Sequence, residues 1–251
     1  MATQAALWRA EPESPAMNQP LSYESLEPLK VVRPVDRIGY IAELCRAKRV
    51  LDIGCLDETS LHKQDTLHWL HGRITQTARS VIGVDLSDLL PAEGIETAPN
   101  ARIHRGDGTN PQVPGLVDAD IDIVVAGEFI EHIESPLDFF ATMRRRFAGR
   151  ELVISTPNAM GFGNTVLGAL RREAQHPDHI HLFSYKILNT LCTRAGFKSW
   201  QIVPYRFYAT DMILSSRGRK RLAAQATEKM VRAVERMFPL LSLGYVVRAE
   251  L

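Results

Sequence analysis

The hydrophobic positions of the chain fall into two kinds of segment between residue 36 and about residue 200. Short apolar runs, several of which end on an acidic residue, alternate with longer segments whose apolar residues recur every three or four positions. The first pattern predicts buried strands, and the second predicts helices that pack one face on a sheet. Alternation of the two is typical of βαβ units, so we expect an α/β fold with a mostly parallel sheet.

Seven strands are expected, at 49–55, 81–85, a segment ending at 103–110, 121–126, 151–155, 197–207 and 245–251. Helices are expected at 36–45, 60–78, 138–147, 185–195 and 217–237. Asp36 is a plausible cap of the first helix, and Gly196 stands directly after the fourth, where helices often end on glycine. The last two strands lack a crossover helix of the usual kind, which favours an antiparallel pair at one edge. The predicted architecture is a doubly wound, seven-stranded, mostly parallel sheet with helices on both faces and an antiparallel edge strand.

The first thirty residues differ from the rest of the chain. They contain prolines 12, 15, 20 and 28 and show little apolar periodicity, which disfavours a helix. We therefore divide the chain into an N-terminal extension, 1–30, and one domain, 31–251. The extension is either a loosely draped segment or an arm anchored by Trp8, Tyr23 and Leu26.

The amino-acid composition limits the class of protein, its partners and its compartment. Of 251 residues, 45% are hydrophobic and 24% are charged, which is enough to fill a core. The net charge of +1 gives the whole molecule no strong attraction to nucleic acid or to anionic membranes. Three scattered cysteines favour a reducing cytoplasm over a disulfide framework. No apolar run approaches the ~20 residues of a spanning helix, and no signal peptide is visible. A homodimer is left open.

Acidic residues stand at the ends of four expected strands, namely Asp52, Asp85, Asp107 and Glu128. Ligands of open α/β sheets bind outside the carboxyl ends of the strands. A buried acid there is costly unless something pairs with it. Gly54 marks the abrupt turn after the first of these strands. The pattern predicts a ligand site along this edge.

The four motifs RVLDIGC, VIGVDLS, GDGTN and IDIVVAGEFIEHI together resemble the class I S-adenosylmethionine-dependent methyltransferases. The resemblance covers residues 36–200 and the final strand, and it implies a Rossmann-like fold with S-adenosylmethionine as cofactor. Asp85 suits the ribose hydroxyls, because one carboxylate can accept both. The resemblance places Asp107 on the adenine amino group and Gly127 beside the methionine portion. The full set of expected cofactor residues is Asp52, Gly54, Asp85, Leu86, Asp107, Gly108 and Gly127.

The first motif departs from the family, since Leu56, Asp57 and Glu58 replace its later glycines. Acidic residues there would repel a pyrophosphate. A nicotinamide-dinucleotide enzyme needs a glycine-rich turn at this point, so we exclude that class.

Glu128, Glu131 and His132 are spaced so that one helical turn would place them on a common face. With STPN and the later His-x-His-x-Phe, this block resembles the metal-dependent small-RNA 2′-O-methyltransferases and the ubiquinone-pathway O-methyltransferases. The resemblance implies a site for Mg²⁺ or another divalent cation with Glu128, Glu131, His132 and His181 as ligands. The alternatives are a metal-free site with His132, His179 or His181 as general base, or a structural role.

A hydroxyl acceptor has too high a pKa to react readily with a sulfonium methyl, so it needs a base or a Lewis acid. The histidines therefore favour O-methylation of a small polyhydroxylated acceptor, such as a sugar, a glycoside or a natural product. An RNA-end 2′-O-methyltransferase and a non-catalytic cofactor-binding protein are the alternatives. The neutral charge and the lack of aromatic residues in the basic run 217–221 make nucleic acid the weaker partner. His62, His68 and His71 are expected on a solvated or packed helix face.

Overall fold

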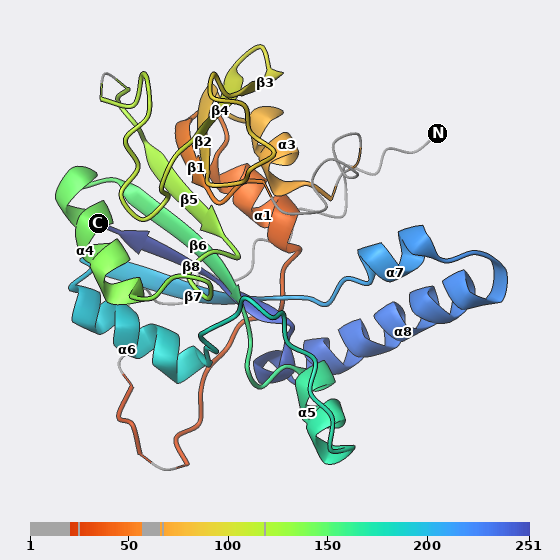
Figure 1. The fold of residues 1–251 in the computed structure, drawn as a ribbon. Coiled ribbons are helices and arrows are strands. Elements are labelled where there is room, and N and C mark those ends of the chain that lie inside the picture. Colours follow the sequence, from red (N-terminus) through yellow and green to blue (C-terminus); the bar gives the residue numbers. More distant parts are fainter. Residues whose placement is uncertain (1–20, 25, 57–65, 67, 118) are drawn as a thin grey trace, which may run out of the picture.

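A central sheet organises the computed structural model, which describes residues 21–24, 26–56, 66, 68–117 and 119–251 (Figure 1). Its strand order is β3-β4-β2-β1-β5-β6-β8-β7. The strands are β1 (Arg49–Ile53), β2 (Ser80–Asp85), β3 (Ile95–Ala98), β4 (Ala101–Arg105), β5 (Ile123–Gly127), β6 (Glu151–Pro157), β7 (Ser199–Tyr205) and β8 (Gly244–Glu250).

The strands from β4 through β2, β1 and β5 to β6 are mutually parallel, and β8 runs antiparallel to both β6 and β7. All seven expected strands are present, and the expected antiparallel pairing of the last two is confirmed. The sheet has eight strands rather than seven, because β3 pairs antiparallel with β4. Its sequence, IETA, is too short and too polar on one side to stand out as an apolar run.

Helices pack on both faces of the sheet. The α-helices of the described residues are α1 (Arg37–Leu44), α3 (Leu70–Thr75), α4 (Pro136–Arg146), α5 (Phe162–Ala169), α6 (Tyr185–Ala195), α7 (Thr210–Ser215) and α8 (Gly218–Met237). On one face, Ile41 of α1 and Ile74 of α3 share a core with Val50 and Val125. On the other face, α4 and α6 pack against the intervening residues of the same strands, such as Leu51 and Val124. This alternation follows from the pleat of a strand.

Local signals fix several helix ends. The carboxylate of Asp36 accepts the Gly39 N–H at 2.8 Å and begins α1, which confirms the cap expected there. Ser135 and Ser184 cap α4 and α6 in the same way. Gly196 ends α6 with a φ of 66°, a left-handed conformation that glycine adopts without strain. These caps set where α4 and α6 begin and where α6 ends.

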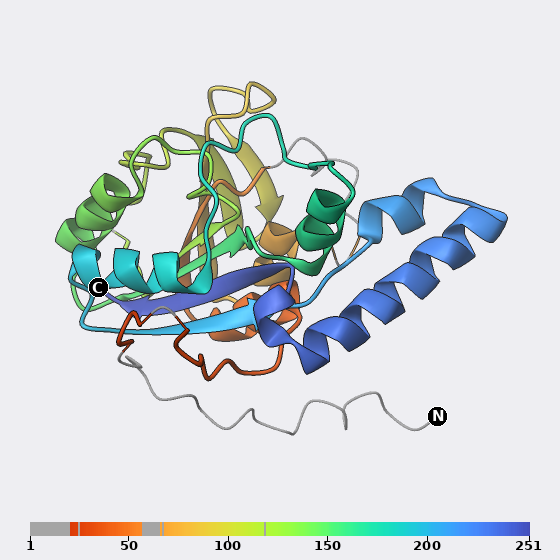
Figure 2. The ribbon, with the colours of Figure 1, turned by 90° about the horizontal axis from the view of Figure 1, so that it is seen from below.

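A part of the described chain extends beyond the sheet and its covering helices. In both ribbon views, α7 and α8 form a hairpin that projects from the body (Figures 1 and 2). Of the predicted extension, Leu21 and Leu29 pack against the α4–α6 core, whereas residues 1–20 lie outside the described range. Of the predicted 60–78 helix, the described part forms only α3, and residues 57–65 and 67 lie outside that range. None of the helices that the structure describes is long and apolar enough to cross a membrane.

Candidate functional site

The predicted ligand edge forms where the parallel strands β4, β2, β1 and β5 end. Ile53 lies beside Val84 on one side and beside Ala126 on the other. The turns that follow β1, β2 and β5 are therefore neighbours, and they carry Gly54, Asp85 and Gly127. The expectation that the acidic strand ends share one edge of the sheet is met by this register.

Close packing explains the glycines along this edge. A Cβ at Gly54, whose φ is 65°, would lie 2.8 Å from Cδ2 of Phe129. A Cβ at Gly108 would lie 2.5 Å from Cγ2 of Ile53, and one at Gly127 would lie 2.7 Å from Cδ2 of Leu70. All three distances are too short for a side chain. Contact of these glycines with a cofactor stays a prediction.

Asp85 ties the turn after β1 to the end of β2. Its carboxylate accepts the backbone N–H groups of Leu56 and Ser87, each at 2.8 Å. Partial burial raises the pKa of Asp85, although these two N–H groups oppose the shift. The neighbouring Leu86 is 63% exposed. A half-buried carboxylate beside an exposed apolar side chain is suited to a ligand with a polar sugar and an apolar ring.

Asp107 has a local partner instead. Its Oδ1 atom accepts both the backbone N–H of Thr109, at 2.8 Å, and the hydroxyl of Thr109, at 2.7 Å. This is the geometry of an Asx turn. One carboxylate oxygen is occupied by the turn, so the predicted contact with adenine would fall to Oδ2.

Asp52 is enclosed by the protein, and its role as a cofactor-binding residue stays a prediction. It is 1% exposed, and its Oδ2 lies 2.8 Å from Nδ1 of His71. The other ring nitrogen of His71 lies 2.8 Å from Oγ1 of Thr97. His71 on α3 is thus the partner that a buried acid requires, and the pair positions the end of β1. His71 occupies a packed helix face, one of the two environments expected for it.

Arg37 is a site residue that sequence reasoning missed. Its Nη1 lies 3.1 Å from Oγ of Ser155 and 3.6 Å from Oε1 of Glu128, and its guanidinium carbon is 5.8 Å from the ring centroids of Tyr205 and Tyr208. Its Nε is buried with no hydrogen-bond partner in the described chain. The sequence signal that could have identified Arg37 is its position in the first turn of α1, the helix that leads into β1.

Glu128 and Glu131 face different surroundings. Glu128 has a φ of 52° and accepts hydrogen bonds from the hydroxyls of Ser155, at 2.9 Å, and Tyr205, at 3.1 Å. Glu131 is 1% exposed, and neither carboxylate oxygen has a hydrogen-bond partner among the described residues. Burial, and next the charge of Glu128, raises the pKa of Glu131 to about 9. Burial therefore disfavours the charged form of this carboxyl group.

The backbone of Glu131 fastens a distant loop to this turn. Its carbonyl accepts the N–H groups of Ile180, at 2.9 Å, and His181, at 3.2 Å. The loop that carries His176 and His179 therefore lies over the turn that carries His132. These contacts join residues that are about fifty positions apart in the sequence.

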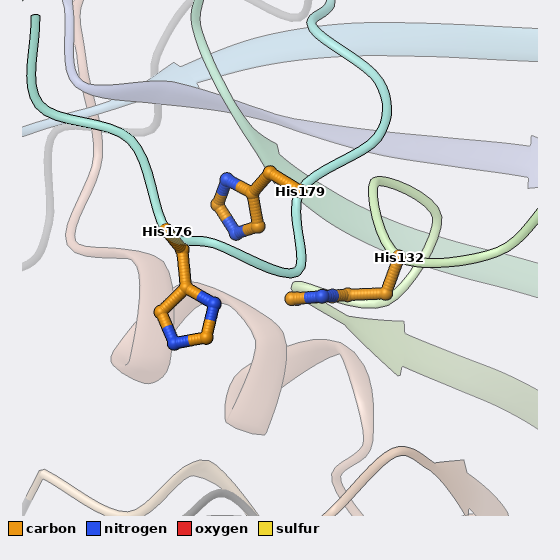
Figure 3. Close-up of side chains that lie close together, drawn as sticks. All are labelled: His132, His176 and His179. Carbon is orange, nitrogen blue, oxygen red and sulfur yellow. The ribbon is translucent and has the colours of Figure 1, made fainter.

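Three histidines converge as a result, and Figure 3 shows the three rings turned toward one space. The ring centroids of His132 and His179 are 4.7 Å apart, and His176 lies 5.9 Å from His132 and 5.4 Å from His179. Nδ1 of His132 lies 3.2 Å from the carbonyl oxygen of Asp178. A carbonyl only accepts, so Nδ1 carries the proton and Nε2 keeps a free lone pair. We call His132, His176 and His179 the histidine cluster.

The histidine cluster differs from the predicted set of metal ligands. Glu128 is engaged by Ser155 and Tyr205, and Nε2 of His181 lies 3.2 Å from the carbonyl oxygen of Glu134. Of the predicted ligands, only His132 belongs to a compact group in the described chain; the groups found are His132–His176–His179 and Asp52–Cys55–His71. His176, which was not predicted to be a ligand, belongs to this group, and a metal-binding role for Glu128, Glu131 and His181 stays a prediction.

The chemistry of the donors distinguishes these two groups. Partial burial, followed by the nearby His132 and His176, lowers the pKa of His179, which keeps its imidazole neutral near pH 7. Neutral imidazoles suit Zn²⁺ and similar transition metals, whereas Mg²⁺ prefers oxygen ligands. The expected magnesium ion does not fit the histidine cluster. In the second group, burial raises the pKa of the Cys55 thiol well above its ordinary value, which disfavours the thiolate form that binds metals.

Comparison with known proteins agrees with this architecture. A family described as "Methyltransferase domain" matches residues 24–202. No curated protein matches the chain. Similar solved structures include the small RNA methyltransferase HEN1, with a TM-score of 0.52 and 19% identity over 85% of this chain and 24% of that one. An S-adenosylmethionine-dependent methyltransferase from Mesorhizobium loti has a TM-score of 0.51 and 16% identity over 86% and 96% of the two chains.

A possible histamine N-methyltransferase from Thermotoga maritima has a TM-score of 0.50 and 17% identity over 85% of this chain and 89% of that one. At these identities, the structural likeness shows the fold alone. The family match covers most of the chain and includes β1, β2, β4 and β5, whose ends form the ligand edge. The chain belongs to the methyltransferase-domain family and is a class I methyltransferase whose implied cofactor is S-adenosylmethionine.

Proposed function

We propose that the chain transfers the methyl group of S-adenosylmethionine to a hydroxyl of a small polyhydroxylated acceptor, such as a sugar, a glycoside or a natural product. The observation that carries this proposal is the histidine cluster beside the end of β5. Methyl transfer to a hydroxyl requires a proton acceptor, and a neutral imidazole is suited to that task near pH 7.

On the cofactor side, the proposal assigns the ribose to Asp85 and the adenine region to Leu86, Asp107 and Gly108. Arg37 would bind the methionine carboxylate. Its Nη1 is 3.6 Å from the position that a Cβ would take at Gly127, and its buried Nε has no partner within the described chain. A buried guanidinium with a spare donor favours an anionic group of the ligand.

In the proposed reaction, the acceptor oxygen attacks the sulfonium methyl in line as the carbon–sulfur bond breaks. The hydroxyl proton passes to a ring nitrogen of His179 or His132, and S-adenosylhomocysteine leaves as a neutral sulfide. The protein mainly aligns donor and acceptor and excludes water. His132 has the better-defined proton-accepting nitrogen, because the carbonyl of Asp178 fixes its tautomer.

The same three side chains fit a transition-metal ion. His132, His176 and His179 would hold it, and a bound ion such as Zn²⁺ would act as a Lewis acid that lowers the pKa of the acceptor hydroxyl. Metal content of the purified protein, measured by mass spectrometry, and calorimetric titration with Zn²⁺ test this form of the site without an activity assay. If the purified protein binds no Zn²⁺, the metal form of the site is excluded and a histidine imidazole is the base.

The activity is tested by transfer of a labelled methyl group to a panel of sugars, glycosides and hydroxylated natural products. His132→Ala should abolish transfer and leave S-adenosylmethionine binding, followed by calorimetry, unchanged. Turnover on amines alone would contradict O-methylation, and tight cofactor binding without turnover on any acceptor would favour a non-catalytic role. A salt-sensitive shift of small RNA would favour the RNA-end alternative, toward which the name of the HEN1 neighbour points.

We also propose that residues 31–251 form one catalytic domain that works in the cytoplasm. Support for one domain comes from β8, which lies between β6 and β7 and joins the end of the chain to the central sheet. Support for a reducing compartment comes from Cys45, Cys55 and Cys192, all of which are free and buried.

A further inference from the structure

Helix α8 has two apolar faces, and the described part of the chain covers only one of them. Ala224 and Val231 are buried. A second set of apolar residues is exposed along the full length of the helix. Its members recur at helical spacing and share one face. We call this set the outer stripe; it consists of Leu222, Ala226, Met230, Ala233 and Met237. Leu222, Met230 and Met237 are 66%, 54% and 67% exposed, so the projecting hairpin presents large apolar side chains to solvent.

Charge is divided between the two faces of α8. Arg219, Lys229 and Arg236 lie three residues from members of the outer stripe and are exposed. None of the three forms an ion pair with a carboxylate of the described chain. Arg217, Lys220 and Arg221 add positive charge at the tip of the hairpin, where every residue from 217 to 223 is exposed.

The acidic residues of α8 face the body. Glu235 accepts the N–H groups of Phe207 and Leu243, each at 2.8 Å. Glu228 accepts the N–H of Ala209 at 2.8 Å and pairs with Arg232. The outward surface of α8 is therefore apolar and cationic, although the whole chain has a net charge of only +1.

We propose that α8 docks on the surface of an anionic phospholipid bilayer. The helix would lie parallel to the membrane, with the outer stripe at the boundary between headgroups and acyl chains and its flanking cations on the headgroup phosphates. This arrangement is typical of interfacial amphipathic helices, and twenty residues provide a contact about 30 Å long.

The charge pattern favours a membrane over two other occupants. A second copy of the chain that docked through the same stripe would bring Arg219, Lys229 and Arg236 against their like-charged equivalents. A nucleic acid would satisfy the cations but would leave five apolar side chains without a matching surface. Lipid headgroups and acyl chains satisfy both features.

Co-sedimentation of the full chain with lipid vesicles tests the proposal. Binding is expected to vesicles that contain phosphatidylglycerol, to weaken with salt, and to be weaker by an order of magnitude or more on phosphatidylcholine alone. The double substitution Leu222→Ser, Met230→Ser should lower the partition coefficient at least ~tenfold, because two apolar side chains leave the interface. Lys229→Gln should lower it about fivefold on the anionic vesicles only.

Matched controls are available on other surfaces. Val117, which is 92% exposed, and Arg145, on an exposed turn of α4, lie outside α8. Val117→Ser and Arg145→Gln should leave vesicle binding unchanged. Because the outer stripe is exposed, its variants should keep the thermal unfolding midpoint and cofactor affinity of the parent protein.

Three results would overturn the proposal. The first is equal binding, or none, to vesicles of both compositions. The second is vesicle binding that the stripe variants do not change. The third is loss of a concentration-dependent dimer or of an RNA shift in those variants, without any effect on vesicles, which would assign the stripe to that partner instead.

Discussion

The two halves of the ligand edge are built in different ways. On the cofactor side, Asp85 and the glycines lie within a few residues of the strands that place them, and their hydrogen bonds stay between neighbouring strand ends. On the acceptor side, His132 meets His176 and His179 only because a distant loop bonds to the carbonyl of Glu131. Under the proposed function, cofactor binding would depend on local geometry, and acceptor chemistry would depend on the long-range hydrogen bonds to the Glu131 carbonyl.

The largest effect is expected on the acceptor side. His179→Ala should lower kcat by roughly 10²–10⁴-fold, the range typical of a lost general base, while the Kd for S-adenosylmethionine stays constant. His181→Ala in the same loop is the matched control, because Nε2 of His181 bonds to the Glu134 carbonyl and points to no cluster partner. Steady-state methyl transfer and calorimetry measure the two quantities. Equal losses in both variants would restore His181 to the site and contradict the cluster.

Substitutions in the buried pair of Asp52 and His71 test how much this pair stabilises the end of β1. His71→Phe should lower the free energy of unfolding by about 2–3 kcal/mol, since it leaves the carboxylate of Asp52 buried without its partner. Urea denaturation measures the loss. Adding Asp52→Leu should recover part of it, because the double variant contains no unpaired charge. A single variant as stable as the parent would show that the pair does not hold the strand end.

Substitution of Asp85 should weaken cofactor binding and leave the rate of methyl transfer nearly unchanged. Asp85→Asn is expected to raise the Kd for S-adenosylmethionine by about 10- to 100-fold, because an amide is a weaker acceptor than a carboxylate. At saturating cofactor, kcat should change little. Asp107→Asn, at a residue with one oxygen held by Thr109, should have a smaller effect on Kd. If Asp107→Asn were the more damaging change, the ribose and adenine assignments would need to be exchanged.

Arg37 provides the smallest and most selective test. Arg37→Gln should weaken binding of S-adenosylmethionine about tenfold, as expected for one charge-assisted contact. It should not change the affinity for decarboxylated S-adenosylmethionine, which lacks the group that Arg37 would hold. Calorimetry with both ligands gives the comparison. Equal weakening of both would mean that Arg37 acts only through Glu128 and Ser155.

Much of the fold could be predicted because its signals are local. The apolar runs around Leu51 and Val124 and the caps at Asp36 and Gly196 each depend on a few adjacent residues, and the structure confirms them. The short strand β3 was missed because IETA has too few apolar residues to be recognised without its partner β4.

The sequence by itself determined the order of the main strands and the acids at their ends, because strand periodicity is a property of neighbouring residues, and the resemblance of its motifs to a known family implied the methyltransferase class. Tertiary structure alone decided that Asp52 is enclosed with His71, that Arg37 reaches Glu128, and that His176 rather than His181 joins His132. Each of these outcomes depends on contacts between segments far apart in the chain, and neither spacing nor periodicity specifies which face of a loop will meet another element.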